Sequence, residues 1–248
     1  MDLELAGKRA VVVGGSRGIG RAIALQLAME GAEVAIGARD RGHLDATAAD
    51  IGAATGRAVL PVTLDTLLRP SIVAMAETVA AELGGIDILI NCAAGGAGEV
   101  NARFPDVGAE AMLGAMDSKA LGYLRCAQAV APYMIAAGWG RIISLSGLGA
   151  RRSGSIVGTI RNVSVVALMK NLADELAPHH INVTVVHPGA TRTEKTTDAT
   201  RGVPNLLGRM PDAAEVAYVV AFLASPRSVA INGEVIGAGG GTPGTIAY

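Results

Sequence analysis

Short, unbroken runs of apolar residues alternate along this chain with longer segments in which apolar residues recur at helical spacing. Seven short runs predict strands: Ala10–Val13, Glu33–Gly37, Ala58–Val62, Asp87–Asn91, Arg141–Leu145, Asn182–His187 and Glu234–Ile236. Six longer segments predict helices: Gly18–Met29, His43–Ile51, Ser71–Leu83, Ala109–Ala136, Ile160–Leu176 and Ala213–Leu223. Strands that are apolar at nearly every position are buried on both faces, so the pattern predicts a parallel sheet covered by helices on both sides.

Right-handed crossovers between such strands produce a doubly wound α/β sheet of seven strands. The 248 residues contain no internal repeat, linker or block of like charge, so a single domain spanning residues 1–248 is expected. Thr193–Met210 is the least regular stretch, and it is long for a connection between elements. Such segments are often substrate lids, and a plain surface loop is the alternative.

Composition narrows the range of functions. Aromatic residues make up only 3% of the chain, and the formal net charge of -1 is spread along it, which argues against a nucleic-acid partner. Cys92 and Cys126 lack the spacing of metal ligands, so no metal is expected and both are interpreted as reduced thiols of a cytoplasmic protein. No signal peptide and no charge-free apolar run of about 18 residues is evident, so no membrane partner is expected.

A glycine-rich segment, Gly14-Gly15-Ser16-Arg17-Gly18-Ile19-Gly20, lies between the first apolar run and the first helical segment. Glycines in such a turn permit a tight bend, let the backbone approach a pyrophosphate and allow the helix to pack closely on the strand. The phosphates then meet free N–H groups at the helix N-terminus. The position of the motif, after a strand and before a helix, predicts a Rossmann-type dinucleotide site.

The spacing of these glycines resembles the Thr-Gly-x-x-x-Gly-x-Gly pattern of the short-chain dehydrogenase/reductase family, with Val13 in place of the threonine. Other segments resemble the family's motifs in the same order: Asp65-Thr66, Asn91-Cys92-Ala93-Ala94, Gly140-Arg141-Ile142-Ile143, Leu172–Leu176, Pro188-Gly189-Ala190-Thr191-Arg192-Thr193 and Asn232–Gly240. Because the matches run through almost the whole chain, the protein is identified as similar to the classical members of this family.

The resemblance implies a binding site for a nicotinamide dinucleotide. In the family, the carboxylate at the position of Asp65 binds the adenine amine, and the Pro-Gly-x-x-x-Thr segment holds the nicotinamide carboxamide. The residues implied to form the cofactor site are Gly14, Ser16, Arg17, Gly18, Ile19, Gly20, Arg39, Asp65, Thr66, Asn91, Ala93, Pro188, Gly189, Thr191 and Thr193.

The expected cofactor is NADP, with NADPH favoured over NADH. An NAD enzyme usually ends its second strand with an acid that binds the ribose 2′-hydroxyl. Here Ala38 holds that place and Arg39 follows it. Arg17 corresponds to a position that faces the same ribose in the family. Two guanidinium groups suit a 2′-phosphate, and two solvated surface arginines are the alternative.

The family's proton-handling residues are missing. In the family, a tyrosine donates the proton, a lysine one helical turn later lowers its pKa, a serine polarises the carbonyl and an asparagine holds a water. Counting from flanking motifs places these four at Gly158, Asn162, Gly147 and Lys119, respectively. Counting forward from the serine instead places the tyrosine and the lysine at Ile160 and Ser164, so neither register contains a tyrosine.

Three interpretations therefore compete. The protein is a noncatalytic NADP-binding relative, such as a sensor, scaffold or partner subunit. Alternatively, it is an atypical oxidoreductase in which Lys119 donates a proton or the small-molecule substrate needs little acid help. The third interpretation is a structural protein with an empty pocket. We also expect Lys119 and Asn162 to meet, directly or through one water, because a partly buried ammonium needs acceptors; unrelated drift at the two positions is the alternative.

Four further residues carry weaker signals. His187 ends the sixth predicted strand, beside the expected nicotinamide segment, and is either a proton donor or a structural histidine. Arg151, Arg152 and Arg161 surround the place expected for substrate. They form either a site for a carboxylate or phosphate, or a set of solvated arginines.

The helical segments Ala109–Ala136 and Ile160–Leu176 carry apolar residues on more than one face, more than packing on their own sheet requires. The family pairs these two helices across a two-fold axis. The apolar C-terminal strand around Val235 provides a second surface for association. A homodimer or homotetramer is therefore expected.

Overall fold

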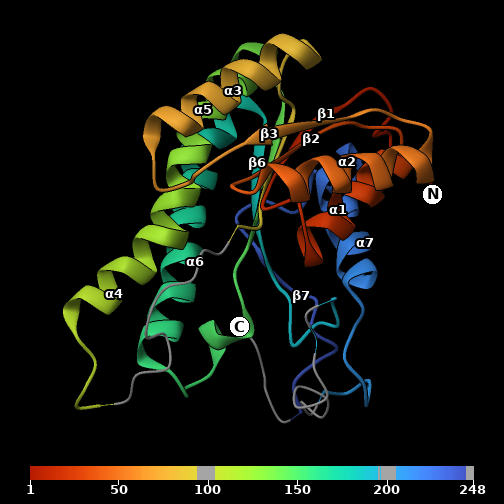
Figure 1. Ribbon diagram of the computed structural model, residues 1–248. Helices are drawn as coiled ribbons and strands as arrows, with labels where there is room; N and C mark the ends of the chain where they lie inside the picture. Colours follow the sequence, from red (N-terminus) through yellow and green to blue (C-terminus); the bar gives the residue numbers. More distant parts are fainter. Residues whose placement is uncertain (94–103, 195, 197–204, 244–248) are drawn as a thin grey trace.

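The computed structural model describes residues 1–93, 104–194, 196 and 205–243. Within these residues the centre is a sheet of seven parallel strands in the order β3-β2-β1-β4-β5-β6-β7 (Figure 1). The strands are β1 (Arg9–Val13), β2 (Glu33–Ala38), β3 (Val59–Thr63), β4 (Ile88–Asn91), β5 (Gly140–Leu145), β6 (Ile181–His187) and β7 (Val235–Gly237). The predicted single-domain, Rossmann-type α/β fold is confirmed.

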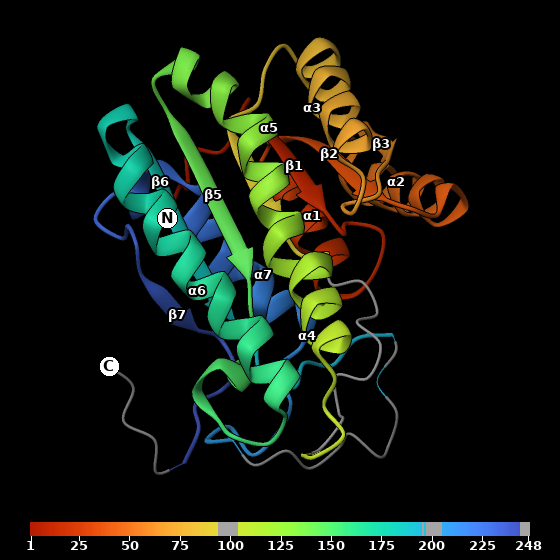
Figure 2. The same cartoon turned by 90° about the vertical axis from the view of Figure 1, so that its left-hand side faces the viewer.

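Helices cover both faces of the sheet (Figure 1 and Figure 2). One face is covered by α1 (Gly18–Met29), α2 (Arg41–Thr55) and α7 (Ala213–Ala224), and the other by α3 (Arg69–Leu83), α5 (Gly122–Ala137) and α6 (Ile156–Leu176). Two separate hydrophobic clusters fill the spaces on either side of the strands. This arrangement explains why the strands are apolar at nearly every position.

The helix predicted as Ala109–Ala136 is interrupted, which corrects the prediction. Helix α4 (Ala109–Met116) passes into a π-helical turn, η1 (Asp117–Leu121), before α5 begins at Gly122. A π-turn holds an additional residue and occurs frequently at functional sites. Lys119 lies within this turn. Apolar periodicity does not distinguish one such turn from the α-helix around it.

Helix α6 begins at Ile156, one turn before the predicted start at Ile160, because the Ser155 hydroxyl caps it by accepting a hydrogen bond from the Gly158 N–H. A short 3₁₀ turn, η2 (Leu148–Arg151), precedes it, and a second, η3 (Ala177–His179), follows it. By length and composition alone, the helical run Ile156–His179 is able to cross a membrane, a criterion that core helices of soluble proteins also meet. Here α6 forms part of the layer over β6.

The carboxyl ends of β1 and β4 border the crevice of the fold. The chain runs from β1 to β2 and β3 on one side, then returns to β4 on the other side of β1. Ligands of open α/β sheets bind at such a switch point. Val13 at the end of β1 lies opposite Gly37 of β2 and Asn91 of β4, so the glycine turn and the segment after β4 meet there.

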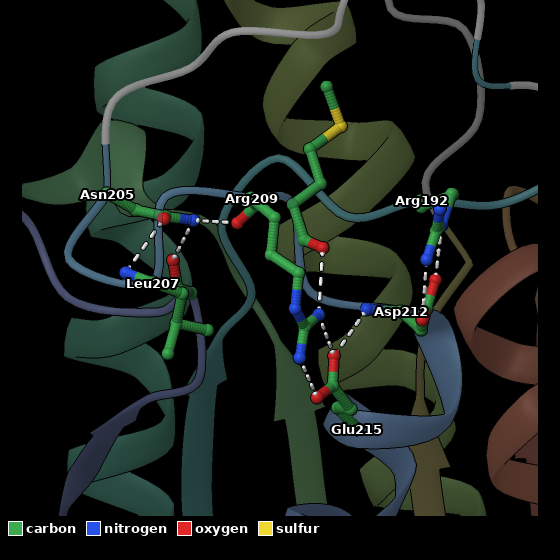
Figure 3. A network of polar contacts seen from close by, with 8 residues as sticks. Arg192, Asn205, Leu207, Arg209, Asp212 and Glu215 are labelled. Carbon is green, nitrogen blue, oxygen red and sulfur yellow. Dashed lines mark hydrogen bonds and ion pairs between the residues drawn. The ribbon is translucent and has the colours of Figure 1, made fainter.

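Half of the predicted lid, Thr193–Met210, lies outside the described residues. Its described parts are 193–194, 196 and 205–210. Just before it, Arg192 pairs with Asp212 in front of α7, and Arg209 pairs with Glu215 in the first turn of that helix (Figure 3). Both ends of the segment are thus attached to the start of α7.

Candidate dinucleotide and proton-transfer site

The glycine turn after β1 contains two close approaches. A Cβ atom on Gly14 would lie 2.6 Å from the Ala93 backbone nitrogen, and the φ of +86° at Gly14 favours glycine. A Cβ atom on Gly20 would lie only 2.1 Å from the Gly14 carbonyl oxygen, so α1 packs against the turn without room for a side chain. The Thr47 hydroxyl donates a 2.8 Å hydrogen bond to the Ser16 carbonyl oxygen and holds the turn to α2.

A cleft of about 600 Å³ opens beside this turn, within the range of about 300–1,000 Å³ for small-molecule sites. Seven of the predicted cofactor residues line it: Gly14, Ser16, Arg17, Arg39, Asp65, Thr66 and Ala93. The rest of its wall consists of Val13, Gly37, Ala38, Asp40, Leu64, Leu67, Cys92 and Ser118. These residues follow the carboxyl ends of β1 to β4, which is where a dinucleotide fits this fold.

Arg17 and Arg39 are both exposed where they line the cleft. Nearby carboxylates have other partners. Asp40 caps α2 by accepting from the His43 N–H at 2.9 Å, and Asp50 pairs with Arg21. The two guanidinium groups are therefore available to an anionic group of a ligand, and Ala38 adds no competing acid beside them.

Asn91 does not line the cleft. Its side chain is fully buried and donates a 3.1 Å hydrogen bond from Nδ2 to the Ser144 hydroxyl, which joins β4 to β5. Asp65 does line the cleft, and its Oδ1 accepts from the Leu67 N–H at 3.0 Å. Of these two predicted residues, Asp65 offers a carboxylate to a ligand, whereas Asn91 fixes the strands beneath it.

The other predicted cofactor residues lie around α1 and after β6. Gly18, Ile19 and Gly20 form the first turn of α1. Pro188 and Gly189 line a second cavity of about 230 Å³. The Thr191 hydroxyl bonds to the Gly189 carbonyl oxygen at 3.0 Å, and the Thr193 methyl lies beside Gly18. The structure thus brings the segment after β6 to the start of α1.

Lys119 and Asn162 meet directly, which confirms the predicted contact. The Lys119 Nζ donates to Asn162 Oδ1 at 2.8 Å and to the Ser146 carbonyl oxygen at 2.9 Å. Lys119 is only 5% exposed. Burial, followed by the charge of Arg161, lowers the pKa of Lys119 to about 7. The amine is therefore divided between its charged and neutral forms near neutral pH.

Gly147 and Gly158 adjoin this contact. A Cβ atom on Gly147 would lie 3.3 Å from Asn162 Oδ1, and the Gly158 carbonyl oxygen accepts a 2.8 Å hydrogen bond from Asn162 Nδ2. All four candidate positions therefore gather beyond the carboxyl end of β5. Ile160, the tyrosine position in the alternative register, is 39% exposed.

Two hydroxyl groups near the end of β5 are engaged with the backbone. Ser146 Oγ donates to the Asn162 carbonyl oxygen at 2.9 Å. The Tyr123 hydroxyl donates to the Leu145 carbonyl oxygen at 3.1 Å, and burial raises the pKa of Tyr123 well above its ordinary value. Both hydroxyl protons are thus directed to backbone carbonyl oxygens.

His187 is buried at the end of β6, and its Nδ1 accepts a 3.2 Å hydrogen bond from the Gly147 N–H. Burial, with the charges of Arg151 and Lys119, lowers the pKa of His187 to about 4, so the ring is neutral at pH 7. This geometry favours the structural interpretation of His187. Arg151 and Arg152, but not Arg161, line a cavity of about 220 Å³, so the three arginines do not form one cluster there.

Cys92 and Cys126 are free thiols. Burial raises the pKa of Cys92 to about 11 and that of Cys126 to about 12, which keeps both protonated. Within the part of the chain that the structure describes, no group of three or more His, Cys, Asp and Glu side chains is arranged to hold a metal ion.

Comparison with known proteins agrees with this geometry. A family model described as "Enoyl-(Acyl carrier protein) reductase" matches residues 13–242. The chain is 33% identical to the 3-oxoacyl-[acyl-carrier-protein] reductase FabG of Escherichia coli (strain K12), over 96% of this chain and 98% of that protein. It is 31% identical to the short-chain reductase protein NovJ of Streptomyces niveus, over 94% and 93% of the two chains. The chain belongs to the short-chain dehydrogenase/reductase family.

Solved structures of the family share the fold closely. L-sorbose reductase from Gluconobacter frateurii, complexed with NADPH and L-sorbose, superposes with a TM-score of 0.90 at 26% identity, covering 99% of this chain and 100% of that chain. A short-chain type dehydrogenase/reductase from Mycobacterium marinum has a TM-score of 0.88 at 31% identity and covers 98% of each chain. The chain therefore retains the short-chain dehydrogenase/reductase fold over nearly its whole length.

Two contacts at the glycine turn and the start of α1 were not anticipated from the sequence. One is the hydrogen bond between Thr47 and Ser16 described above. The other is made by Glu194, whose carboxylate accepts from the Gly18 N–H at 2.9 Å. Glu194 lies 176 residues from Gly18, and no motif spacing links them, so only the fold reveals their contact.

The Gly20→Ala variant tests the close approach of α1 to the turn. An added methyl group has no room beside the Gly14 carbonyl oxygen, so the free energy of unfolding in urea is expected to fall by about 1–3 kcal/mol. Gly52→Ala on α2 is the matched control, because a Cβ atom there makes an ordinary 3.5 Å contact with the Arg57 carbonyl oxygen. Equal stability of the two variants would contradict the packing described here.

Proposed function

We propose that this protein binds NADP(H) in preference to NAD(H) and is an atypical oxidoreductase that reduces ordinary ketones poorly. The observation that carries the proposal is the buried Lys119 amine, held by Asn162 and Ser146 beside two glycines. We assign Lys119, Gly147, Gly158 and Asn162 to the four positions of the family's catalytic residues. The proposed small-molecule substrate is one that can be reduced with an amine, rather than a tyrosine phenol, as the proton donor.

The cofactor preference is supported by the residues of this chain. Arg17 and Arg39 line the cleft, and Ala38 stands where an NAD enzyme usually carries an acid. Relatives differ in this respect: L-sorbose reductase was solved with NADPH, and a 7α-hydroxysteroid dehydrogenase with NADH. The choice therefore depends on the two arginines, whose guanidinium groups suit a 2′-phosphate.

Lys119 is the proposed proton donor. Bound NADPH supplies the hydride in this family. Two of the three ammonium protons are directed to Asn162 and Ser146, which leaves the third for transfer to a substrate. A donor with a pKa near the working pH gives up its proton and regains it from solvent readily. Gly147 and Gly158 adjoin the Asn162 side chain and add no side chain of their own beside this contact.

A noncatalytic NADP-binding protein, acting as a sensor, scaffold or partner subunit, is the second candidate. The observation in its favour is that Gly147 and Gly158 carry no side chain at the positions assigned to the serine and the tyrosine. Neither residue polarises or protonates a carbonyl group. Under this alternative, Lys119 and Asn162 stabilise the pocket, and binding occurs without turnover.

Self-association through α4, α5 and α6 is also proposed. These helices lie together on the face of the molecule turned toward the viewer in Figure 2. Together with the turn η1, they expose the apolar side chains of Leu113, Leu121, Ile135, Ile156, Ile160 and Val163. A second copy of the chain covers this surface in the proposed homodimer or homotetramer. The two free thiols support a cytoplasmic location, and no nucleic-acid or membrane partner is proposed.

The Arg17→Ala/Arg39→Ala double variant tests the cofactor preference. Charge-assisted hydrogen bonds are worth about 1.5–3 kcal/mol each, so even with solvent screening the Kd for NADPH is expected to rise at least about tenfold. The Kd for NADH should change little. Calorimetric titration with both cofactors measures the effect. The control is Arg57→Ala, because Arg57 is exposed and precedes the amino end of β3, whereas the cleft lies at the carboxyl ends of the strands. Equal binding of NADPH and NADH by the unchanged protein would refute the assignment.

Ketone reduction tests the role of Lys119. With a panel of aliphatic and aromatic ketones, turnover is expected to be at least ~10²-fold slower than in a family member that carries the tyrosine. Because the protonated amine is the donor, residual reduction should decrease as pH rises through about 7, the pKa of Lys119. Lys119→Met should abolish this dependence, whereas Lys8→Met at the far end of the sheet should preserve it.

The outcomes of this experiment separate the two candidate functions. Fast ketone turnover is incompatible with the proposal and requires another acid. Tight NADPH binding with no hydride transfer to any ketone or iminium compound supports the noncatalytic alternative. Slow turnover without a decrease near pH 7 excludes Lys119 as the donor.

Light scattering tests the proposed association. At micromolar concentration the measured mass should be two or four times the 25.0 kDa of one chain. Leu113→Glu, which introduces a charge on the exposed apolar surface of α4, should shift the distribution toward the monomer. A monomeric mass for the unchanged protein rules out this arrangement.

A further inference from the structure

The first turn of α1 receives a carboxylate from a distant part of the chain. The Gly18 N–H lies 2.9 Å from Oε1 and 3.2 Å from Oε2 of Glu194, so both oxygens share one donor. Helix α1 has no acidic residue in its own first turn, and the Arg17 side chain makes no capping hydrogen bond. Glu194 thus supplies the negative charge that the start of this helix lacks.

An anion of a bound ligand would compete with the Glu194 carboxylate for the Gly18 N–H. Free N–H groups and the positive end of the helix dipole make the start of such a helix a site for anions. In a dinucleotide-binding turn, that anion is the pyrophosphate. A carboxylate and a pyrophosphate compete for the Gly18 N–H, because their negative charges repel each other when both lie beside the same donor.

The segment that carries Glu194 is anchored immediately before it. The Arg192 N–H donates to the Pro211 carbonyl oxygen at 2.8 Å, and the Arg192 guanidinium pairs with Asp212, with 2.8 Å between Nη2 and Oδ2 (Figure 3). Asp212 in turn belongs to the capping box of α7 with Glu215. Since Arg192 is fixed, releasing Gly18 requires movement of Thr193 and Glu194 rather than of the whole connection.

We propose that Glu194 is an internal competitor for the cofactor's pyrophosphate. Its carboxylate holds the Gly18 N–H and has to leave when the phosphates bind. Glu194 therefore lowers the affinity for the dinucleotide. Binding in turn releases Thr193 and Glu194, next to the expected nicotinamide segment. This inference rests on the proposed dinucleotide binding, and it assigns to Glu194 a role opposite to that of a cofactor ligand.

Two variants, Glu194→Gln and Glu194→Ala, test the competition. Removing the charge should tighten NADPH binding by about three- to tenfold in calorimetry, the range expected for an anion at a helix N-terminus. The same variants should lower the Tm of the protein without cofactor, because α1 loses its capping carboxylate. Glu82→Gln, an exposed glutamate on α3, is the control and should change neither quantity.

The test is decisive because the variants should bind NADPH more tightly while their Tm without cofactor falls. General structural damage would lower the Tm and weaken NADPH binding together, and that result overturns the inference. Unchanged or weaker NADPH binding by both Glu194 variants also overturns it, while the proposed cofactor function stands.

If the unchanged protein binds neither NADPH nor NADH, the proposed function fails, and inorganic pyrophosphate becomes the probe. Pyrophosphate should then raise the Tm of Glu194→Gln at lower concentrations than it raises that of the unchanged protein. Equal concentration dependence for the two proteins contradicts competition by Glu194.

Discussion

The nucleotide half of this molecule depends on the close approach of α1 to the turn after β1. Gly20 packs so closely against the Gly14 carbonyl oxygen that no side chain fits between them. This contact sets how near the start of α1 lies to the end of β1, and therefore where its free N–H groups point. The cleft beside the turn and the packing of α1 on α7 both follow from the same placement.

The two parts of the candidate site differ in character. Residues that line the cleft lie at the ends of β1 to β4, and a relative solved with NADPH has the same fold over its full length. Beyond β5, a buried lysine meets an asparagine. Burying an ammonium there is costly unless acceptors compensate for the lost water. Asn162 Oδ1 and the Ser146 carbonyl oxygen provide that compensation. Replacing Asn162 alone therefore removes one of the two acceptors that the buried ammonium has here and leaves it the Ser146 carbonyl oxygen.

Sequence patterns were sufficient for the sheet, the glycine turn and the contact between Lys119 and Asn162. The sheet and the glycine turn follow from local rules, apolar runs and glycine spacing. The contact was expected because lysine and asparagine are exchanged between two positions that the family resemblance assigns, and because a partly buried cation needs acceptors. The π-turn around Lys119 and the bond from Glu194 to Gly18 were not predictable in this way. A π-turn has the same apolar spacing as its neighbours, and Glu194 reaches Gly18 only through the tertiary fold. Asn91 shows a third limit, because its motif does not reveal that its side chain is buried between strands and bonds to Ser144.

Because Lys119 lies in the π-turn at Asp117–Leu121, the side chain that meets Asn162 depends on the number of residues in that turn. In an uninterrupted α-helix each residue advances the side-chain direction by about 100°. One residue fewer between α4 and α5 would rotate Lys119 out of line with Asn162 and present Ser118 or Ala120 in its place. An insertion or deletion in this turn would therefore change which side chain lies opposite Asn162 without any substitution in α5 or α6. The length of the turn thus determines whether an amine, a hydroxyl or a methyl group meets the Asn162 amide.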